Sequence, residues 1–200
     1  MVDCGAGLGL RAGEIGGLAV EDIDWLRGTV HVRRALKMIN GRTVFGPPKA
    51  GKERRVPLPE TIKLRLAEHL GTVQPAAPVT LPWESPDGQP VTATLLLHRD
   101  GKVQGRSRIN ALWLQAVRRV GVPAGAGTGQ HQLRHYFASA LLHAGCSVQA
   151  VSEYLGHAGA VITLTTYAHL MPGSDERARA AVDAVFASDG SAPDVRQSPG

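Results

Sequence analysis

The segment HQLRHYF gathers three side chains that could bind an anion and move protons. His131, Arg134 and His135 stand at positions i, i+3 and i+4, so a helix carries them on one face. An arginine can hold a phosphate or a carboxylate with paired hydrogen bonds, and a histidine exchanges protons near neutral pH. The same cluster also occurs on ordinary basic helix faces that touch water. The segment alone leaves both interpretations open.

Two further residues in the C-terminal half could take part in chemistry. His157 follows Gly156, a residue type that ends helices, so this histidine is expected at a helix end. Tyr167 lies within TLTTYAHL, where a tyrosine is more often a half-buried core residue with a bonded hydroxyl. A metal site is not favoured, because no Cys or carboxylate shares the spacing of His157 and His169. No HExxH, P-loop, GxSxG or dinucleotide motif occurs.

The distribution of charge favours a polyanion as partner. The 200 residues carry a formal net charge of +5, and the pI is about 9.6. From Arg27 to Arg65 there are eleven Lys and Arg residues against two acids, Glu53 and Glu60. The segment from Asp175 onward has five acids against three arginines. A basic block before an acidic tail indicates nucleic acid, the alternative being a solvated charged face.

The elements that must position these residues are mostly helical. Apolar periodicity and helix-ending glycines predict helices over 59–70, 107–120, 131–144, 147–155, 163–170 and from 174 onward. Residues 5–19 read as the end of one helix, a Gly-rich corner and the start of another. Alternating segments at 28–35, 42–45 and 54–58 predict a small antiparallel sheet of three strands. The proline-rich segment 71–90 is expected to be an irregular surface loop. The predicted fold class is therefore mainly α with a small three-stranded antiparallel β-sheet.

The composition of the chain indicates which cellular compartment to expect and whether to expect contact with a membrane. No apolar run reaches membrane-spanning length, and the start of the chain lacks the features of a signal peptide. Two cysteines, Cys4 and Cys146, provide neither a disulfide framework nor a metal-binding spacing. We therefore expect a cytoplasmic protein with reduced thiols and no membrane partner.

Four segments, in order, resemble the motifs of the tyrosine recombinases, the phage integrase family. GLGLRAGEIGGLAVEDID resembles the motif of the first arginine, and PPKAGKERRVPLP the strand-turn-strand motif with its lysine. HQLRHYFASALLHAG resembles the His-x-x-Arg-His motif. YLGHAGAVITLTTYAHL resembles the Leu-Gly-His motif and the Thr-rich helix with the nucleophile. The resemblance runs from about Gly5 to Leu170 and implies the fold of the DNA breaking-rejoining enzyme catalytic domain.

The resemblance implies that Arg11 and Arg134 hold the scissile phosphate and that His157 adds another donor. Guanidinium groups suit this role, because they stay charged and can pair with the non-bridging oxygens. Glu14 and His135 match neighbouring positions of the motifs, and we interpret them as orienting or structural residues. No metal and no cofactor are expected, since the arginines provide the positive charge.

The resemblance further implies that Tyr167 is the nucleophile and that His131 takes its proton. A lysine would protonate the leaving 5′ oxygen; Lys49 matches the motif, but Lys52 lies in the same turn. The product is a 3′-phosphotyrosyl link that a 5′ hydroxyl can religate without ATP. The implied activity is site-specific DNA recombination, including DNA integration, of a mobile element. The alternatives are a truncated, non-catalytic DNA-binding remnant and, less favoured, a type IB topoisomerase.

The expected domain organisation is an integrase-type catalytic domain over 1–187 and a disordered tail over 188–200. Compared with the family, the N-terminal core-binding domain and the first helix of the catalytic domain are expected to be absent. Loss of that helix would expose part of the core, around Leu8, Leu10, Ile15 and Leu18.

The expected partner is double-stranded DNA, followed along its phosphates by the basic hairpin region. About half of seven candidate cations are expected to touch it: Arg33, Arg34, Lys37, Arg42, Lys52, Arg54 and Arg55. A homo-oligomer is expected to assemble on DNA through the last helix. The alternative is that this helix folds back on its own core. Its apolar face comprises Ala178, Ala181, Val182, Val185 and Phe186.

Overall fold

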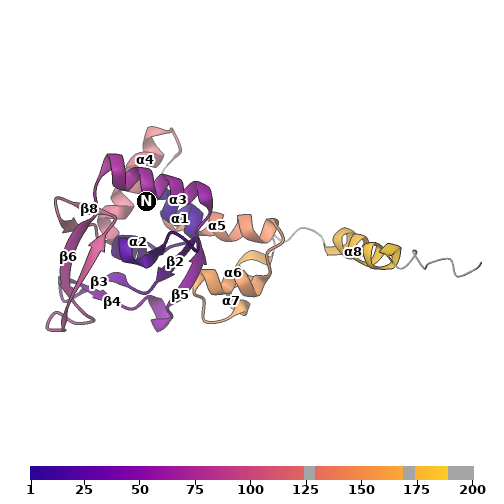
Figure 1. Cartoon of the computed structure of the whole chain (residues 1–200), viewed down its shortest axis with the longest axis horizontal. Coiled ribbons are helices and arrows are strands. Elements are labelled where there is room, and N and C mark those ends of the chain that lie inside the picture. The colour runs from indigo at the N-terminus through magenta and orange to yellow at the C-terminus, as the bar shows by residue number, and fades with distance from the viewer. Residues whose placement is uncertain (124–128, 169–173, 189–200) are drawn as a thin grey trace, which may run out of the picture.

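Helices form most of the computed structural model, which describes residues 1–123, 129–168 and 174–188. The order of helices and strands along the chain is shown in Figure 1. Three short helical turns, η1 (Val20–Asp22), η2 (Lys49–Gly51) and η3 (His69–Val73), lie between the longer elements. The helices are α1 (Val2–Leu8), α2 (Ala12–Gly17), α3 (Glu60–Glu68), α4 (Arg106–Arg119), α5 (His131–His143), α6 (Val148–Leu155), α7 (Ala160–Tyr167) and α8 (Ser174–Ser188).

The strands form small antiparallel sheets, which together with the helices confirms the predicted fold class. One sheet has three strands in the order β1-β2-β5, and the pairs β3–β4, β6–β7 and β8–β9 form two-stranded sheets. The strands are β1 (Ile23–Asp24), β2 (Thr29–Val32), β3 (Ala35–Ile39), β4 (Arg42–Gly46), β5 (Arg54–Pro57), β6 (Ala77–Pro82), β7 (Pro90–Leu95), β8 (His98–Arg99) and β9 (Lys102–Val103).

The membership of the three-stranded sheet differs from the prediction. The segment 28–35 is divided after Val32, and the hairpin β3–β4 forms a separate sheet. The division coincides with Arg33 and Arg34, whose guanidinium nitrogens both lie 2.6 Å from the carboxylate of Asp22. These two ion pairs lie where the strand is interrupted, although an alternating pattern alone predicts a continuous strand.

The proline-rich segment 71–90 was predicted to be an irregular loop. This prediction is wrong, because part of the segment forms β6. This strand pairs with β7 from Ala77↔Leu95 to Pro82↔Pro90. In a two-stranded sheet each strand has one unpaired edge, which is where a strand tolerates residues without an N–H. Val79 of β6 is buried and packs in a second apolar cluster with Phe45 and Leu95.

The main core is closed at the N-terminal end of the described chain, in contrast to the expectation that part of it would be exposed. Leu8, Leu10 and Ile15 are fully buried, and Leu18 is 3% exposed. They belong to one apolar cluster that also includes Phe137 of α5. Helix α1 packs along α5, so elements far apart in sequence cover this part of the core.

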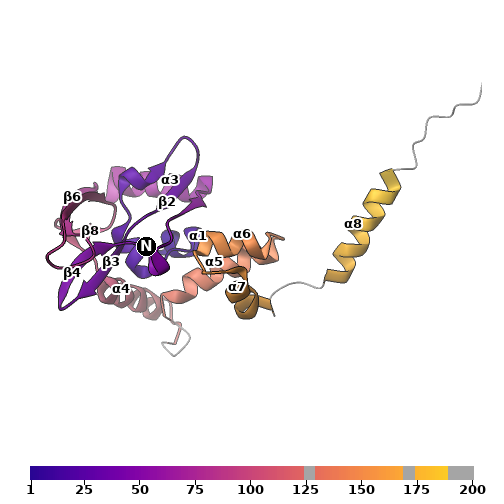
Figure 2. The same cartoon turned by 90° about the horizontal axis from the view of Figure 1, so that it is seen from below.

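Helix α8 stands apart from the rest of the described chain in both views (Figures 1 and 2). It runs to Ser188, one residue past the expected domain boundary; of the tail expected over 188–200, residues 189–200 lie outside the described residues. Three of its apolar side chains are exposed: Val182, Val185 and Phe186. Ala178 and Ala181, the other two members of the predicted apolar face, lie outside the described side chains. None of the described residues in α8 belongs to either apolar cluster.

Candidate active site

One cavity of about 330 Å³ brings together all six predicted catalytic residues. They reach it from different elements: the N-terminus of α2, the turn η2, helix α5, the residue after Gly156 at the end of α6, and helix α7. His135, predicted to be orienting or structural, lines the same cavity. The seven residues are Arg11, Lys49, His131, Arg134, His135, His157 and Tyr167.

The two arginines share one backbone acceptor. Arg134 is 2% exposed; its Nη1 donates to the carbonyl oxygen of Gly9 at 2.6 Å, and its Nη2 donates to that of Leu155. Arg11 Nη1 donates to the same Leu155 oxygen at 3.3 Å. Burial, and next the positive charge of Arg11, lower the pKa of Arg134 to about 9. Arg134 is therefore still protonated at neutral pH, and two cations lie beside one cavity.

The shared oxygen is presented by the end of α6. Ser147 begins this helix, its Oγ accepting from the N–H of Ala150, and Gly156 ends it in the left-handed region with φ 62°. The orphan carbonyl groups of a helix C-terminus attract cations. The turn thus supplies the acceptor for both arginines and carries the adjacent His157 into the cavity.

Glu14 fixes Arg11 from behind the cavity. Its carboxylate accepts from the backbone N–H of Arg11 at 2.8 Å and from Arg11 Nη1 at 3.1 Å. Two nitrogens of Arg54 also donate to it, at 3.0 and 2.8 Å. Burial by itself would raise the pKa of Glu14, but hydrogen bonds and charge from Arg54, followed by those from Arg11, hold it below its usual value. The carboxylate therefore stays ionised between two arginines.

His157 is held as a neutral ring. Its Nδ1 lies 2.8 Å from Oγ1 of Thr163, a fully buried residue of α7. Burial, followed by the charges of Arg134 and Arg11, lowers its pKa to about 4. A neutral histidine that accepts at Nδ1 carries its proton on Nε2 and can donate it to an oxygen in the cavity.

Tyr167 is 4% exposed, and its hydroxyl lies 2.7 Å from Nδ1 of His135. Burial raises the pKa of Tyr167, while the charge of Arg134 acts in the opposite direction. His131, predicted to take the phenolic proton, contacts the ring of His135 edge-on, with centroids 5.0 Å apart. Burial, and then the charges of His135 and Arg134, lower the pKa of His131.

The two candidate lysines occupy different positions. Lys49 lines the cavity, whereas Lys52 is absent from its lining. The Nζ of Lys52 lies 3.4 Å from the carbonyl oxygen of Ala158, next to His157. Lys49 therefore lies on the wall of the cavity, and Lys52 lies beside it.

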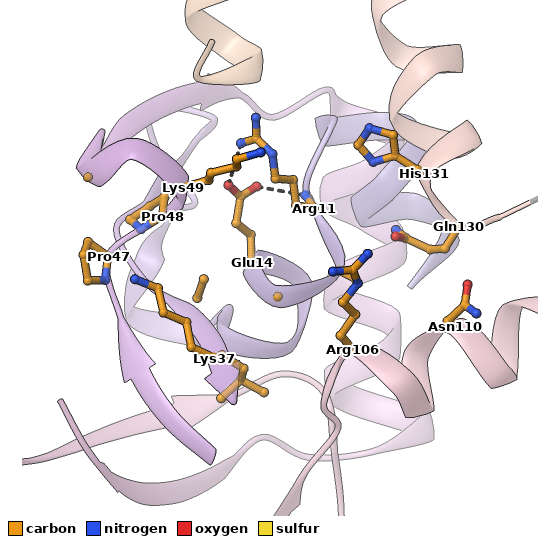
Figure 3. A pocket seen from close by; sticks show the side chains of 15 residues that line it. Arg11, Glu14, Lys37, Pro47, Pro48, Lys49, Arg106, Asn110, Gln130 and His131 are labelled. Atoms are coloured by element: carbon orange, nitrogen blue, oxygen red, sulfur yellow. Dashed lines mark hydrogen bonds and ion pairs between the residues drawn. The ribbon is translucent and has the colours of Figure 1, made fainter. Parts of the chain in front are cut away.

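A larger cavity of about 790 Å³ adjoins the first and shares Arg11, Lys49 and His131 with it. Figure 3 shows that Lys37 and Arg106 also line it. Sequence reasoning included Lys37 but missed Arg106, which begins α4 directly after Gly105. The signal was available, since GRSRIN places Arg106 directly before the predicted helix and Arg108 in its first turn.

Two of the seven cations predicted to bind DNA are buried inside the protein. Arg34 is 6% exposed and bound to Asp22, and Arg54 is 8% exposed and bound to Glu14. Their hydrogen bonds within the protein leave neither available to a phosphate at the surface.

The other predicted DNA-binding cations are at least partly exposed, in different surroundings. Arg33 is paired with Asp22, and Arg55 lines a hollow that also contains Asp24. Lys37 lines the larger cavity of the site. Arg42 and Lys52 are exposed.

Other types of site find no support among the described residues. No group of three or more His, Cys, Asp or Glu side chains there could hold a metal ion. In the same parts of the chain, none of the helices has the length and apolar character needed to cross a membrane.

The fold is that of integrase catalytic domains. The Tn1549 transposon integrase, solved in complex with transposon right end DNA, matches with a TM-score of 0.72 at 22% identity, over 92% of this chain and 57% of that one. The catalytic domain of bacteriophage HP1 integrase matches with a TM-score of 0.55 at 21% identity, over 96% of this chain and 82% of that one.

Sequence comparison defines the family. The model of the phage integrase family matches residues 2–173, and the chain belongs to this family. Tyrosine recombinase XerD of Staphylococcus epidermidis is 33% identical over 164 residues, which are 81% of this chain and 46% of the relative. Tyrosine recombinase XerA of Pyrococcus horikoshii is 25% identical over 168 residues, 82% of this chain and 49% of the relative. The chain spans about half the length of these curated relatives.

Proposed function

We propose that this chain is the catalytic domain of a tyrosine recombinase, which cuts and rejoins DNA strands for site-specific recombination, including DNA integration. The observation that carries the proposal is the single cavity lined by two arginines, a lysine, three histidines and a buried tyrosine. Family membership supports it, as do the names of the relatives, which are recombinases. We assign residues 1–187 to this domain.

In the proposed reaction the scissile phosphate binds between Arg11 and Arg134. Their positive charge stabilises the extra negative charge that develops on the non-bridging oxygens during in-line attack. His157 donates a further hydrogen bond from Nε2. Glu14 orients Arg11 through the two hydrogen bonds that its carboxylate accepts from that residue.

Tyr167 gives its phenolic proton to a histidine of the cavity, its oxygen attacks the phosphorus, and the bond to the 5′ oxygen breaks. Lys49 gives a proton to this leaving oxygen, which forms a 5′ hydroxyl, while the 3′ phosphate remains on the tyrosine. Attack by another 5′ hydroxyl then reverses these steps and joins a new pair of ends. The reaction as written is complete without a metal ion or a nucleotide cofactor.

Double-stranded DNA is the proposed partner, and it would run across the two adjoining cavities. Lys37, Lys49 and Arg106 provide positive charge there, which favours phosphates at any sequence. Arg42 and Lys52 are exposed and could contact the flanking backbone. We further propose that α8 joins protomers into a homo-oligomer on DNA, for which its exposed apolar residues are the support. The setting would be the cytoplasm, whose reducing conditions suit the two free cysteines.

The test is a covalent trap with the full chain and a pool of nicked duplexes that have a randomised core. After cleavage beside a nick, a short fragment carrying the 5′ hydroxyl diffuses away, and the protein remains attached to the 3′ phosphate. We expect adducts that survive SDS and disappear on proteolysis. Sequencing of the trapped DNA then identifies the target. If wild-type protein gives no adduct above the level of Tyr167→Phe, the proposed activity is refuted in favour of non-catalytic binding.

A further inference from the structure

The hydroxyl of Tyr167 has a specific partner that the family motif does not assign to it. Among the described residues, its one hydrogen bond is to Nδ1 of His135, at 2.7 Å. The two rings lie 5.5 Å apart between centroids and are tilted by 55°. His131 instead packs its ring against His135. The histidine that meets the nucleophile is therefore His135.

The charge state of His135 allows its Nδ1 to accept this hydrogen bond. Burial, and next the positive charge of Arg134 on the same helix, lower the pKa of His135. The ring is therefore neutral near pH 7, and its Nε2–H tautomer has a lone pair on Nδ1. Its ring contacts those of His131 from α5 and Tyr167 from α7, and the cations Arg11, Lys49 and Arg134 line the same cavity, as does His157. In the Nε2–H tautomer the phenol donates, and Nδ1 accepts.

On the basis of the proposed function, we propose that His135, rather than His131, accepts the proton of Tyr167 during attack on the DNA strand. The O–H bond of the tyrosine breaks, and its proton moves to Nδ1 of His135. The phenolic oxygen forms the new bond to phosphorus, and the bond to the 5′ oxygen breaks. In religation the imidazolium returns the proton to the tyrosine. His131 is then free to donate to the phosphate, which would explain its place in the cavity.

The contact between Tyr167 and His135 could serve to position the hydroxyl or to accept its proton. Variants of His135 separate these two roles. His135→Asn retains an amide oxygen near the place of Nδ1, so it can position the hydroxyl but cannot become protonated near neutral pH. His135→Ala removes both functions. His131→Ala tests the rival base, and His143→Ala is the matched control, since His143 is exposed at the other end of α5.

The decisive measurement is the rate of adduct formation in full-length protein with either tyrosine or a fluorinated tyrosine of lower pKa at position 167. A phenol that ionises more readily depends less on a base. We expect His135→Ala and His135→Asn to slow tyrosine attack by about 10²- to 10⁴-fold, the usual range for general base catalysis. With the fluorinated residue, or at higher pH, this deficit should shrink at least tenfold. The deficit of His131→Ala should stay unchanged, and His143→Ala should match wild type.

Other outcomes overturn the inference in distinguishable ways. Wild-type rates in His135→Ala would exclude any role in proton transfer. A large deficit in His135→Ala with full activity in His135→Asn would reduce the residue to positioning. A deficit of His131→Ala that shrinks with the fluorinated residue, while that of His135→Ala does not, would make His131 the base. If even wild-type protein forms no adduct, the proposed function fails first and this inference fails with it.

Discussion

At the scale of single residues, the burial of the Tyr167 ring determines how a variant without the hydroxyl group should behave. Tyr167→Phe deletes only the hydroxyl oxygen, so it should abolish covalent attachment to DNA while the ring still fills its place. The lost hydrogen bond to His135 is worth about 1 kcal/mol, which leaves folding almost intact. Adduct formation and gel-shift affinity are measured on the same preparation. Tyr136→Phe on α5 is the control, because its side chain is exposed, and it should behave as wild type.

A second prediction uses two adjacent arginines of β5. Arg54 is buried against Glu14, whereas Arg55 is exposed. Arg54→Ala leaves a buried carboxylate with one partner fewer, so we expect a loss of about 3–5 kcal/mol in the free energy of unfolding. Arg55→Ala should change it by less than about 0.5 kcal/mol. Urea unfolding of both variants provides the comparison, and equal stabilities would contradict the buried pair.

The same pair predicts a response to acid. Because the pKa of Glu14 is lowered on folding, its contribution to stability is present above the usual value of 4.5. That contribution is lost as the pH falls through the pKa of the folded state. The stability gap between wild type and Glu14→Gln should therefore be largest at neutral pH and narrow below pH 4.5. Unfolding curves from pH 7 to pH 3 measure it, and a gap that widens with acid would show that the carboxylate is not stabilised by its arginines.

Spacing along one helix was enough to predict that His131, Arg134 and His135 would share one face, because helix geometry is local. The burial of Arg34 and Arg54 could not be predicted in the same way. Each is neutralised by an acid from another element, Asp22 or Glu14, and nothing in a basic stretch of sequence identifies those partners. The contact between His135 and Tyr167 likewise depends on how α5 and α7 pack.

At the scale of elements, the end of α6 should be sensitive to one added methyl group. Gly156 has φ 62°, and a Cβ there would lie 3.0 Å from Cδ of Arg54. Gly156→Ala should cost about 1–2 kcal/mol for the left-handed backbone and slow adduct formation by displacing the Leu155 carbonyl. Gly159 begins α7 in extended geometry with nothing within 4 Å of a built Cβ, so Gly159→Ala is the control. We measure thermal unfolding and adduct rate; a Gly156→Ala protein equal to the control would contradict this prediction.

Most helices could be predicted from apolar periodicity and from glycine stops, since both are local signals. The sheets could not be predicted as well. Ion pairs from Arg33 and Arg34 to Asp22 interrupt the expected first strand, and the prolines of β6 suggested a loop although they lie in a two-stranded sheet. Strand pairing is decided by distant partners, so a local pattern cannot determine it.

At the scale of the whole molecule, α8 is expected to be dispensable for folding and required for assembly. Its described side chains contribute to neither apolar cluster. A chain stopped after residue 173 should therefore keep the melting temperature of the intact chain but fail to form higher-order complexes on DNA with paired target sites. Light scattering with and without this DNA measures assembly. A shortened chain that assembles equally well would show that α8 does not join protomers, and a lower melting temperature would show that α8 packs on its own domain.

The Leu155 carbonyl, which both arginines use, has a consequence for how this site can change during evolution. An oxygen of the main chain is present whatever side chain position 155 carries, so no ordinary substitution deletes it. A mutational scan at that position would report on packing alone and would leave this anchor undetected. A mutation can displace the Leu155 carbonyl oxygen only by changing the turn at the end of α6. In that turn Gly156 is the residue type best suited to the backbone. Selection for the position of the Leu155 carbonyl oxygen should therefore act on residue 156, where glycine suits the left-handed backbone.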